Sequence, residues 1–355
     1  MASPRRKYSM RPRPATSQAR LPDVVHHLRS GRFLKLSALA AAGAVALSAC
    51  GGPNLGKENF ARTTVPAAGD SAATSGPITD PAVAPAVLRD VLPCQFLDKT
   101  AMSPLGTLQG EATASTTQFD SCAAKATDPG GKEIRARVEV GGIVTFVSDK
   151  TTGSVGGLPQ VEVPDVGDSA GCVVSALTSR DPALGVSFRV DYPGGDACAA
   201  GRKLVATAVE KLHNNPQKYT PGPGTLLAVD PCTVLDQSAV DGVVKGGKPR
   251  SSGLHSCEWG LIPSVRVTMF PGVAPTEGDG WLKTDVGTPT QAYAKQGTSS
   301  GSSCQVKWQH RQWQDDHVEV VQLEYSNSDA QADKDDPCGK TVGLAKQLAG
   351  KLPAA

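Results

Sequence analysis

Cysteine is the residue type with the clearest chemistry in this chain of 355 residues. Nine cysteines occur, and eight of them lie beyond residue 90 at long spacings. An even number of cysteines without a Cys-x-x-Cys pair indicates structural disulfides in an exported protein, rather than a zinc or redox site. The eight residues are Cys94, Cys122, Cys172, Cys198, Cys232, Cys257, Cys304 and Cys338.

These cysteines divide into two sets of four with similar spacings. The intervals are 28, 50 and 26 residues in the first set and 25, 47 and 34 in the second. Four cysteines allow three connectivities in each set. Shorter separations and a shared offset from a cysteine to the following helix favour Cys94–Cys122, Cys172–Cys198, Cys232–Cys257 and Cys304–Cys338. Each bridge is expected to contribute about 3 kcal/mol by constraining the unfolded chain.

The short sequences around the cysteines recur in the same order in both sets, which predicts a tandem duplication. Pro93-Cys94-Gln95-Phe96-Leu97-Asp98 matches Pro231-Cys232-Thr233-Val234-Leu235-Asp236, Ser121-Cys122 matches Ser256-Cys257, and Asp196-Ala197-Cys198 matches Asp336-Pro337-Cys338. The first repeat is assigned to residues 87–214 and the second to residues 226–355. Prolines at 216, 221 and 223 mark residues 215–225 as a linker.

Each repeat is expected to place its cysteines on an antiparallel sheet. Apolar and polar residues alternate over 134–140 and 186–192 in the first repeat, and over 265–269 and 321–325 in the second. Such alternation is typical of strands with one buried and one solvated face. A short helical element at Pro-Cys opens each repeat, with Asp98 or Asp236 as helix N-cap, and the second continues over 237–244. Each repeat closes on an amphipathic helix. The predicted fold class is α+β, with helices packed on each sheet after a disordered tether.

The aromatic and histidine residues of the second repeat are the candidates for a ligand site. Trp308, His310, Trp313 and His317 lie close together in the sequence, beside Asp315 and Asp316. A metal or ligand patch is one interpretation, but a hairpin turn over 312–316 is favoured. Trp259 follows a cysteine; it is either a ligand platform or, the favoured interpretation, a ring packed on the disulfide and core. No catalytic, cofactor or metal residues are predicted.

The ninth cysteine, Cys50, follows a segment with the layout of an export signal. Residues 1–49 hold nine Lys and Arg and one Asp, and an apolar run from Phe33 to Leu47 follows the basic part. Leu47-Ser48-Ala49-Cys50 resembles a bacterial lipobox. The resemblance implies cleavage before Cys50, a diacylglycerol on its sulfur, and acyl chains such as palmitate that hold the protein to a membrane. The alternatives are an ordinary secreted protein and a single-pass N-terminal anchor.

Residues 50–86 are predicted to be a flexible tether. They are rich in Gly, Pro, Ala, Ser and Thr and have too few large apolar residues to offset the entropy of ordering. Without the signal, 27 Lys and Arg face 33 Asp and Glu, which is a net charge of −6. An acidic chain of this kind gives no indication of nucleic-acid binding. No second apolar run approaches membrane-spanning length, so the lipid is expected to be the only membrane attachment.

A family resemblance follows from the second repeat. Asp230-Pro231-Cys232-Thr233-Val234-Leu235, followed by Ser256-Cys257-Glu258-Trp259, is similar to the signature of a large family of actinobacterial lipoproteins of unknown function. The first repeat departs from it, because Leu92 replaces the Asp and Ala124 stands where Trp259 stands. The resemblance implies an extracytoplasmic α+β domain and no particular activity.

Together these features predict a lipoprotein on the outer face of the cytoplasmic membrane, in the cell-wall space. Duplicated domains on a tether suit a non-enzymatic binding module for an envelope component, a small molecule or a partner protein. The alternatives are a structural or assembly factor for an envelope complex and, less favoured, a cell-envelope hydrolase.

Overall fold

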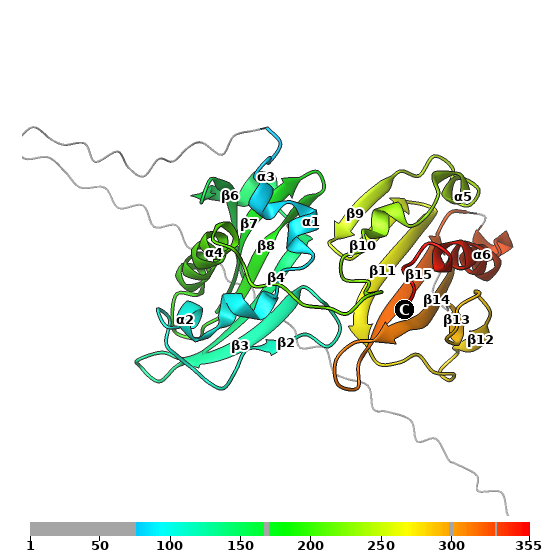
Figure 1. Ribbon diagram of the computed structural model, residues 1–355. Helices are drawn as coiled ribbons and strands as arrows, with labels where there is room; N and C mark the ends of the chain where they lie inside the picture. The colour runs from blue at the N-terminus through cyan, green and yellow to red at the C-terminus, as the bar shows by residue number, and fades with distance from the viewer. Residues whose placement is uncertain (1–75, 167–169, 298–300, 331) are drawn as a thin grey trace, which may run out of the picture. The chain divides into compact units, whose positions relative to one another are not determined.

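The alternating segments form two antiparallel sheets in the computed structural model, which describes residues 76–166, 170–297, 301–330 and 332–355 (Figure 1). The first sheet contains β1 (Thr107–Leu108), β2 (Thr113–Ala114), β3 (Ser121–Thr127), β4 (Glu133–Ile143), β5 (Thr151–Val155), β6 (Leu158–Pro164), β7 (Gly171–Arg180) and β8 (Ala183–Asp191). The second contains β9 (Pro249–Gly253), β10 (Ser256–Gly260), β11 (Ser264–Gly272), β12 (Leu282–Thr284), β13 (Ala292–Gln296), β14 (Ser302–Gln312) and β15 (Val318–Asn327).

The two sheets have the same strand order. The first runs β1-β3-β4-β8-β7-β6-β5, with β2 also paired to β3. The second, read from its β9 edge, runs β9-β10-β11-β15-β14-β13-β12. Each strand except β2 therefore has a counterpart in the other sheet, and the α+β prediction of two disulfide-stapled sheets with helices is confirmed.

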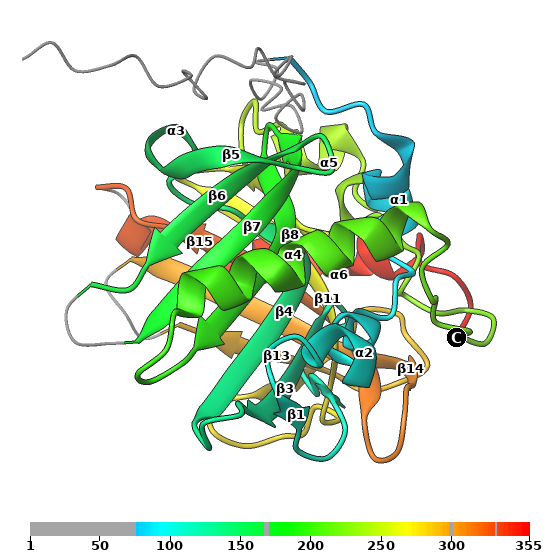
Figure 2. The same ribbon diagram turned by 90° about the vertical axis from the view of Figure 1, so that its left-hand side faces the viewer.

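One long helix covers one face of each sheet. Helix α4 (Ala197–His213) packs against β7 and β8, as Figure 2 shows, and α6 (Pro337–Ala349) packs against β14 and β15. Asp196 and Asp336 cap these helices by accepting hydrogen bonds from the N–H groups of Ala199 (2.8 Å) and Gly339 (2.9 Å). The apolar stripe of each helix and the apolar strand residues facing it form two separate cores.

Four disulfides join these layers with the predicted connectivity. The sulfur atoms of Cys94 and Cys122, Cys172 and Cys198, Cys232 and Cys257, and Cys304 and Cys338 lie within bonding distance. In each repeat one bridge ties the Pro-Cys turn to the strand second from the sheet edge, β3 or β10, and the other ties β7 or β14 to the first turn of the long helix. The same two points are therefore fixed in both sheets.

The short helices are η1 (Pro81–Val83), α1 (Pro85–Leu88), η2 (Pro93–Leu97), α2 (Lys99–Met102), α3 (Val147–Lys150), η3 (Pro231–Thr233), α5 (Gln237–Asp241) and η4 (Ala332–Lys334). Asp98 caps α2 as predicted, with 2.8 Å between its Oδ1 and the N–H of Ala101. Asp236 is the N-cap residue of α5 as predicted, but its side chain makes no cap bond and instead contacts Lys351. Helix α5 ends at Asp241, before the predicted limit of 244, and Gly242 follows it.

The tether prediction extended too far along the chain. Val83 and Leu88 are each 1% exposed and belong to the first core, so residues 81–86 are part of the fold. Prolines at the start of η1 and α1 favour these short helices. The predicted signal, Cys50 and the tether to residue 75 lie outside the described residues. Among the described residues, no helix is long and apolar enough to cross a membrane.

Each repeat inserts one apolar side chain into the core of the other repeat. All described residues belong to one compact unit. Phe119, which precedes β3, is buried in the second core, and Leu254, which precedes β10, is buried in the first. The side chain of Leu254 occupies the space that a Cβ on residue 141 would need. Gly141 also adopts a positive φ of 72°, which glycine tolerates. The predicted linker is also packed, since the N–H of Leu92 donates to the carbonyl of Gln217.

Candidate functional site

The predicted tryptophan sites are part of the second core. Trp259 and Trp308 are each 1% exposed and pack among the apolar residues of the second sheet and α6. Burial at this level leaves no indole face for a ligand, so neither ring forms a platform. The chain has few aromatic residues, and the largest of them fill the centre of the core.

The residues around 310–317 form the hairpin between β14 and β15. The N–H of Trp313 donates to the carbonyl of His317, and Asp315 has the positive φ of a tight turn. His310 Nε2 lies 2.8 Å from the carbonyl of Gly224 and is engaged there. Trp313 packs edge-on against Phe119 and Tyr219. The structure therefore gives His310 and Trp313 structural partners and does not bring them together with His317 around a shared hollow.

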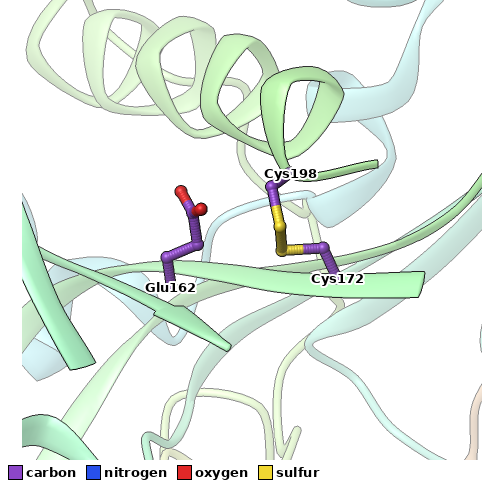
Figure 3. A group of neighbouring side chains, drawn as sticks. All are labelled: Glu162, Cys172 and Cys198. Atoms are coloured by element: carbon purple, nitrogen blue, oxygen red, sulfur yellow. A yellow bond between two sulfur atoms is a disulfide. The ribbon is translucent and has the colours of Figure 1, made fainter. Parts of the chain in front are cut away.

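One group of potential metal ligands occurs in the described part of the chain, and its chemistry excludes a metal. Glu162, Cys172 and Cys198 offer three close ligand atoms (Figure 3). Both sulfurs are consumed in a disulfide, so no thiolate is available. Glu162 bonds instead to Arg202 of α4 at 2.6 Å.

A hollow of about 920 Å³ lies at the edge of the first sheet, beside η2 and α2. Its apolar residues include Leu92, Cys94, Leu108 and Ala112. This volume is within the range of small-molecule pockets. By size alone it is a candidate binding site.

Gln95 and Asp98, two of the polar residues of this edge hollow, already have hydrogen-bond partners. The Gln95 amide bonds to the carbonyls of Leu92 and Gln217 and to the N–H of Gln217. Asp98 accepts a hydrogen bond from Lys211 at 2.7 Å. Burial alone would raise the pKa of Asp98, but the bonds from Lys211 and from the N–H of Ala101 outweigh it and lower that pKa. Neither Gln95 nor Asp98 is therefore left in need of a ligand.

The face of the first sheet opposite α4, called the open face below, carries the less satisfied groups. Its side chains come from alternate positions of β4 and its neighbours, between the buried positions that face α4. Arg137 on β4 is directly opposite Arg189 on β8. Like charges in directly opposite positions of an antiparallel pair are destabilising. This arrangement is unfavourable unless an anion lies nearby.

The two arginines have different partners. Arg189 is neutralised by Asp165, with nitrogen–oxygen distances of 3.2 and 2.7 Å, and by Asp191 at 3.3 Å. The bond to Asp165 raises the pKa of Arg189. Arg137 donates to the neutral oxygens of Ser121 (3.0 Å) and Gln118 (2.9 Å). Arg137 therefore has no hydrogen-bonded carboxylate among the described residues.

Glu139, two residues along β4 on the same face, is the second unsatisfied group. It is half-buried, and its carboxyl group has no hydrogen-bond partner in the described part of the chain. Burial raises the pKa of Glu139, the charge of Asp120 raises it further, and Arg137 partly opposes both. A carboxyl group held in this way favours its protonated form more than an exposed one does.

These groups line a hollow of about 460 Å³ in the open face. Arg137, Glu139 and Arg189 are among its polar residues, and Val161, Val163 and Val173 are among its apolar residues. Ile143, also in its wall, is 47% exposed. A second hollow of about 430 Å³ shares both arginines. Strands position all of these side chains, which makes the geometry more rigid than that of a loop site.

The second repeat has a different set of residues at the same positions. The pairs Cys122–Val138 and Cys257–Val267 align the two sheets, so Arg266 corresponds to Arg137. Arg266 is opposite Glu324 on β15, where the first repeat has Arg189. It also bonds to Glu258 at 3.1 Å. Thr268 takes the place of Glu139. On the corresponding face of the second sheet, the arginine is therefore paired with acids of the same face.

The comparisons with known proteins add no assignment. No family model matches the chain, and neither a curated protein nor a solved structure matches it.

Proposed function

We propose that the first repeat binds a small amphipathic anion of the cell envelope on its open face. The observation that supports this most strongly is the Arg137–Arg189 pair, which replaces the self-neutralised Arg266–Glu324 pair of the second repeat. A duplicated sheet has no structural need for two opposed arginines. Arg189 is already neutralised by Asp165 and Asp191, so an anionic ligand would gain its charge-assisted hydrogen bonds from Arg137.

Arg137 is the anchor for the acidic group of the ligand. A guanidinium has five N–H donors, and Arg137 uses two of them on Ser121 and Gln118. The remaining donors suit a carboxylate or phosphate. The apolar part of the ligand lies against Ile143, Val163 and Val173, and burial of an alkyl chain there contributes about 0.8 kcal/mol per methylene.

Glu139 gives the site a pH dependence. In its protonated form it donates a hydrogen bond to the acidic group, and in its ionised form it repels that group. Binding therefore weakens as pH rises through the raised pKa of Glu139.

The proposed setting is that of a lipoprotein held by Cys50 on the outer face of the cytoplasmic membrane and belonging to the actinobacterial family named above. The signal layout and lipobox support the anchor. The four disulfides support an oxidising compartment. An amphipathic ligand from the membrane would be close to a protein anchored there.

Native mass spectrometry with dodecanoate as probe tests this function and locates the site. Val173→Trp fills the hollow in the open face and is expected to abolish the bound mass. Ala112→Trp fills the edge hollow, and Ala114→Trp adds the same ring on exposed β2 outside both hollows. Both are expected to keep binding.

Loss of dodecanoate in Ala112→Trp alone would place the ligand in the edge hollow and contradict the proposal. Absence of binding to the unsubstituted protein would contradict it as well. Protein purified from its own envelope should carry a mass excess that leaves on denaturation.

A further inference from the structure

The hairpin between β10 and β11 exposes two large apolar side chains at its tip. Leu261 is 83% exposed and Ile262 is 64% exposed. The corresponding turn of the first repeat, between β3 and β4, is polar and consists of Asp128, Pro129, two glycines and Lys132. The fold therefore does not require apolar residues at this tip, and their exposure needs another reason.

The base of this hairpin is held in place. Gly260 has a positive φ of 74°, and a Cβ there would overlap Val244 and Pro263. A Cβ at Gly247 would lie 3.1 Å from the nitrogen of Gly260. The segment 244–247 thus packs directly against the hairpin. The tip is presented by close backbone contacts at its base.

Three cations lie on β9 and the segment before it, on one side of this hairpin. Lys245 and Lys248 flank the packed glycine, and Arg250 lies on β9 opposite Glu258. All three are exposed, and none has a carboxylate within ion-pair distance among the described residues. Glu258, the nearest acid on β10, is engaged by Arg266. This basic collar, defined as Lys245, Lys248 and Arg250, contrasts with the acidic mature chain.

We infer that the Leu261–Ile262 tip inserts into the surface of an anionic phospholipid bilayer while the basic collar contacts the head groups. Apolar side chains ringed by Lys and Arg are the pattern of interfacial membrane contacts. Only 25 residues separate Cys50 from the first described residue. An anchor at Cys50 would therefore hold the described part of the chain near the membrane.

This contact goes beyond ligand binding on the open face and uses none of its residues. The two proposals can therefore fail separately. If both hold, the second repeat orients the protein on the membrane and the first repeat takes a ligand there.

Vesicle co-sedimentation tests the inference. The mature chain with Cys50→Ser removes the lipid, and vesicles of phosphatidylglycerol and of phosphatidylcholine are compared. We expect binding to phosphatidylglycerol at least about ten-fold tighter, because each Lys or Arg near an anionic surface contributes about five-fold. High salt should remove that preference.

Two double variants, each with a control, separate the contribution of the apolar tip from that of the basic collar. Leu261→Ser with Ile262→Ser is expected to weaken vesicle binding about ten-fold or more. Leu282→Ser is the matched control, since Leu282 is 66% exposed on β12. Lys245→Gln with Lys248→Gln is expected to weaken binding to phosphatidylglycerol about 20-fold. Lys283→Gln, at an exposed lysine paired with Glu277, is its control.

Equal effects of the tip variants and Leu282→Ser would overturn the inference. So would binding that does not distinguish the two lipids, or the absence of vesicle binding, which would instead indicate a protein partner for the tip. Circular dichroism of each variant checks that the sheets are intact.

Discussion

The two repeats share strand order, disulfides and capped helices, yet their open faces carry different chemistry. In the second repeat Arg266 is opposite Glu324 and bonds to Glu258. In the first, Arg137 is opposite Arg189 and bonds only to neutral oxygens. The second repeat shows what the scaffold needs for stability. The departures in the first repeat are therefore best explained by a ligand.

At the hairpin tips the unusual residues are in the second repeat rather than the first. The first repeat has a polar turn, and the second has Leu261 and Ile262. In the first repeat the hairpin tip is polar and the open face has the arginine without a hydrogen-bonded carboxylate. In the second repeat the open-face arginine is paired with acids and the hairpin tip is apolar and exposed. Such a division of roles is open to copies of a duplicated domain, because one copy can retain the scaffold interactions while the other changes.

The largest expected effect concerns what the two repeats share rather than how they differ. Phe119→Ala should lower the free energy of unfolding by about 4 kcal/mol, because it removes a ring buried in the second core. Phe146→Ala is the control, since Phe146 is 60% exposed and should change stability by less than about 0.5 kcal/mol. Urea denaturation measures both.

A loss below about 1 kcal/mol for Phe119→Ala would mean that the repeats do not depend on this exchanged side chain. The two repeats would then be independently stable units, and the open faces would have to be compared in separately expressed repeats.

Giving the second face the charge pattern of the first is expected to have a smaller effect. Glu324→Arg places two arginines opposite each other on β11 and β15 and should cost about 1 kcal/mol. Glu324→Gln, which removes the attraction without adding repulsion, should cost less. Thermal unfolding at low and high salt measures the difference, which salt should reduce. An unchanged stability would show that opposed arginines are tolerated without a ligand, and it would weaken the comparison.

The smallest effect is a pH dependence specific to the first repeat. The raised pKa of Glu139 means that the folded protein holds this proton more tightly than the unfolded chain does. Its contribution is therefore most favourable at pH below the unfolded pKa and is lost as pH rises through the folded pKa. Glu139→Gln should raise stability at neutral pH by roughly 1 kcal/mol and lose that advantage in acid.

Thermal unfolding from pH 4 to pH 8 measures this advantage. Asp315→Asn, at an exposed acid in the β14–β15 turn, is the matched control. A constant difference between Glu139→Gln and the unsubstituted protein at every pH would contradict the account of Glu139.

Much of the fold could be predicted from the sequence because its signals are local. Alternation over 134–140 predicted β4, and the offset from Cys198 and Cys338 to the helices predicted the disulfides. The end of the tether was missed because Val83 and Leu88 are isolated apolar residues with no period. Their burial depends on a surface made by the rest of the chain.

The candidate site could not be predicted, because it depends on register. Arg137 and Arg189 are 52 residues apart in sequence, and each is an ordinary charge on the solvated side of an alternating strand. Only the pairing of β4 with β8 brings them opposite each other. Trp259 and Trp308 are too buried to form the ligand platform considered as one interpretation, and the favoured interpretation of Trp259, a ring packed in the core, is confirmed.

The central claim is that the arginine of the first face binds an anion and the arginine of the second face does not. The most direct measurement is calorimetric titration of dodecanoate into the unsubstituted protein, Arg137→Gln and Arg266→Gln. The account predicts that Arg137→Gln weakens binding roughly ten-fold or more while Arg266→Gln leaves it unchanged. Equal affinity in all three proteins would contradict it.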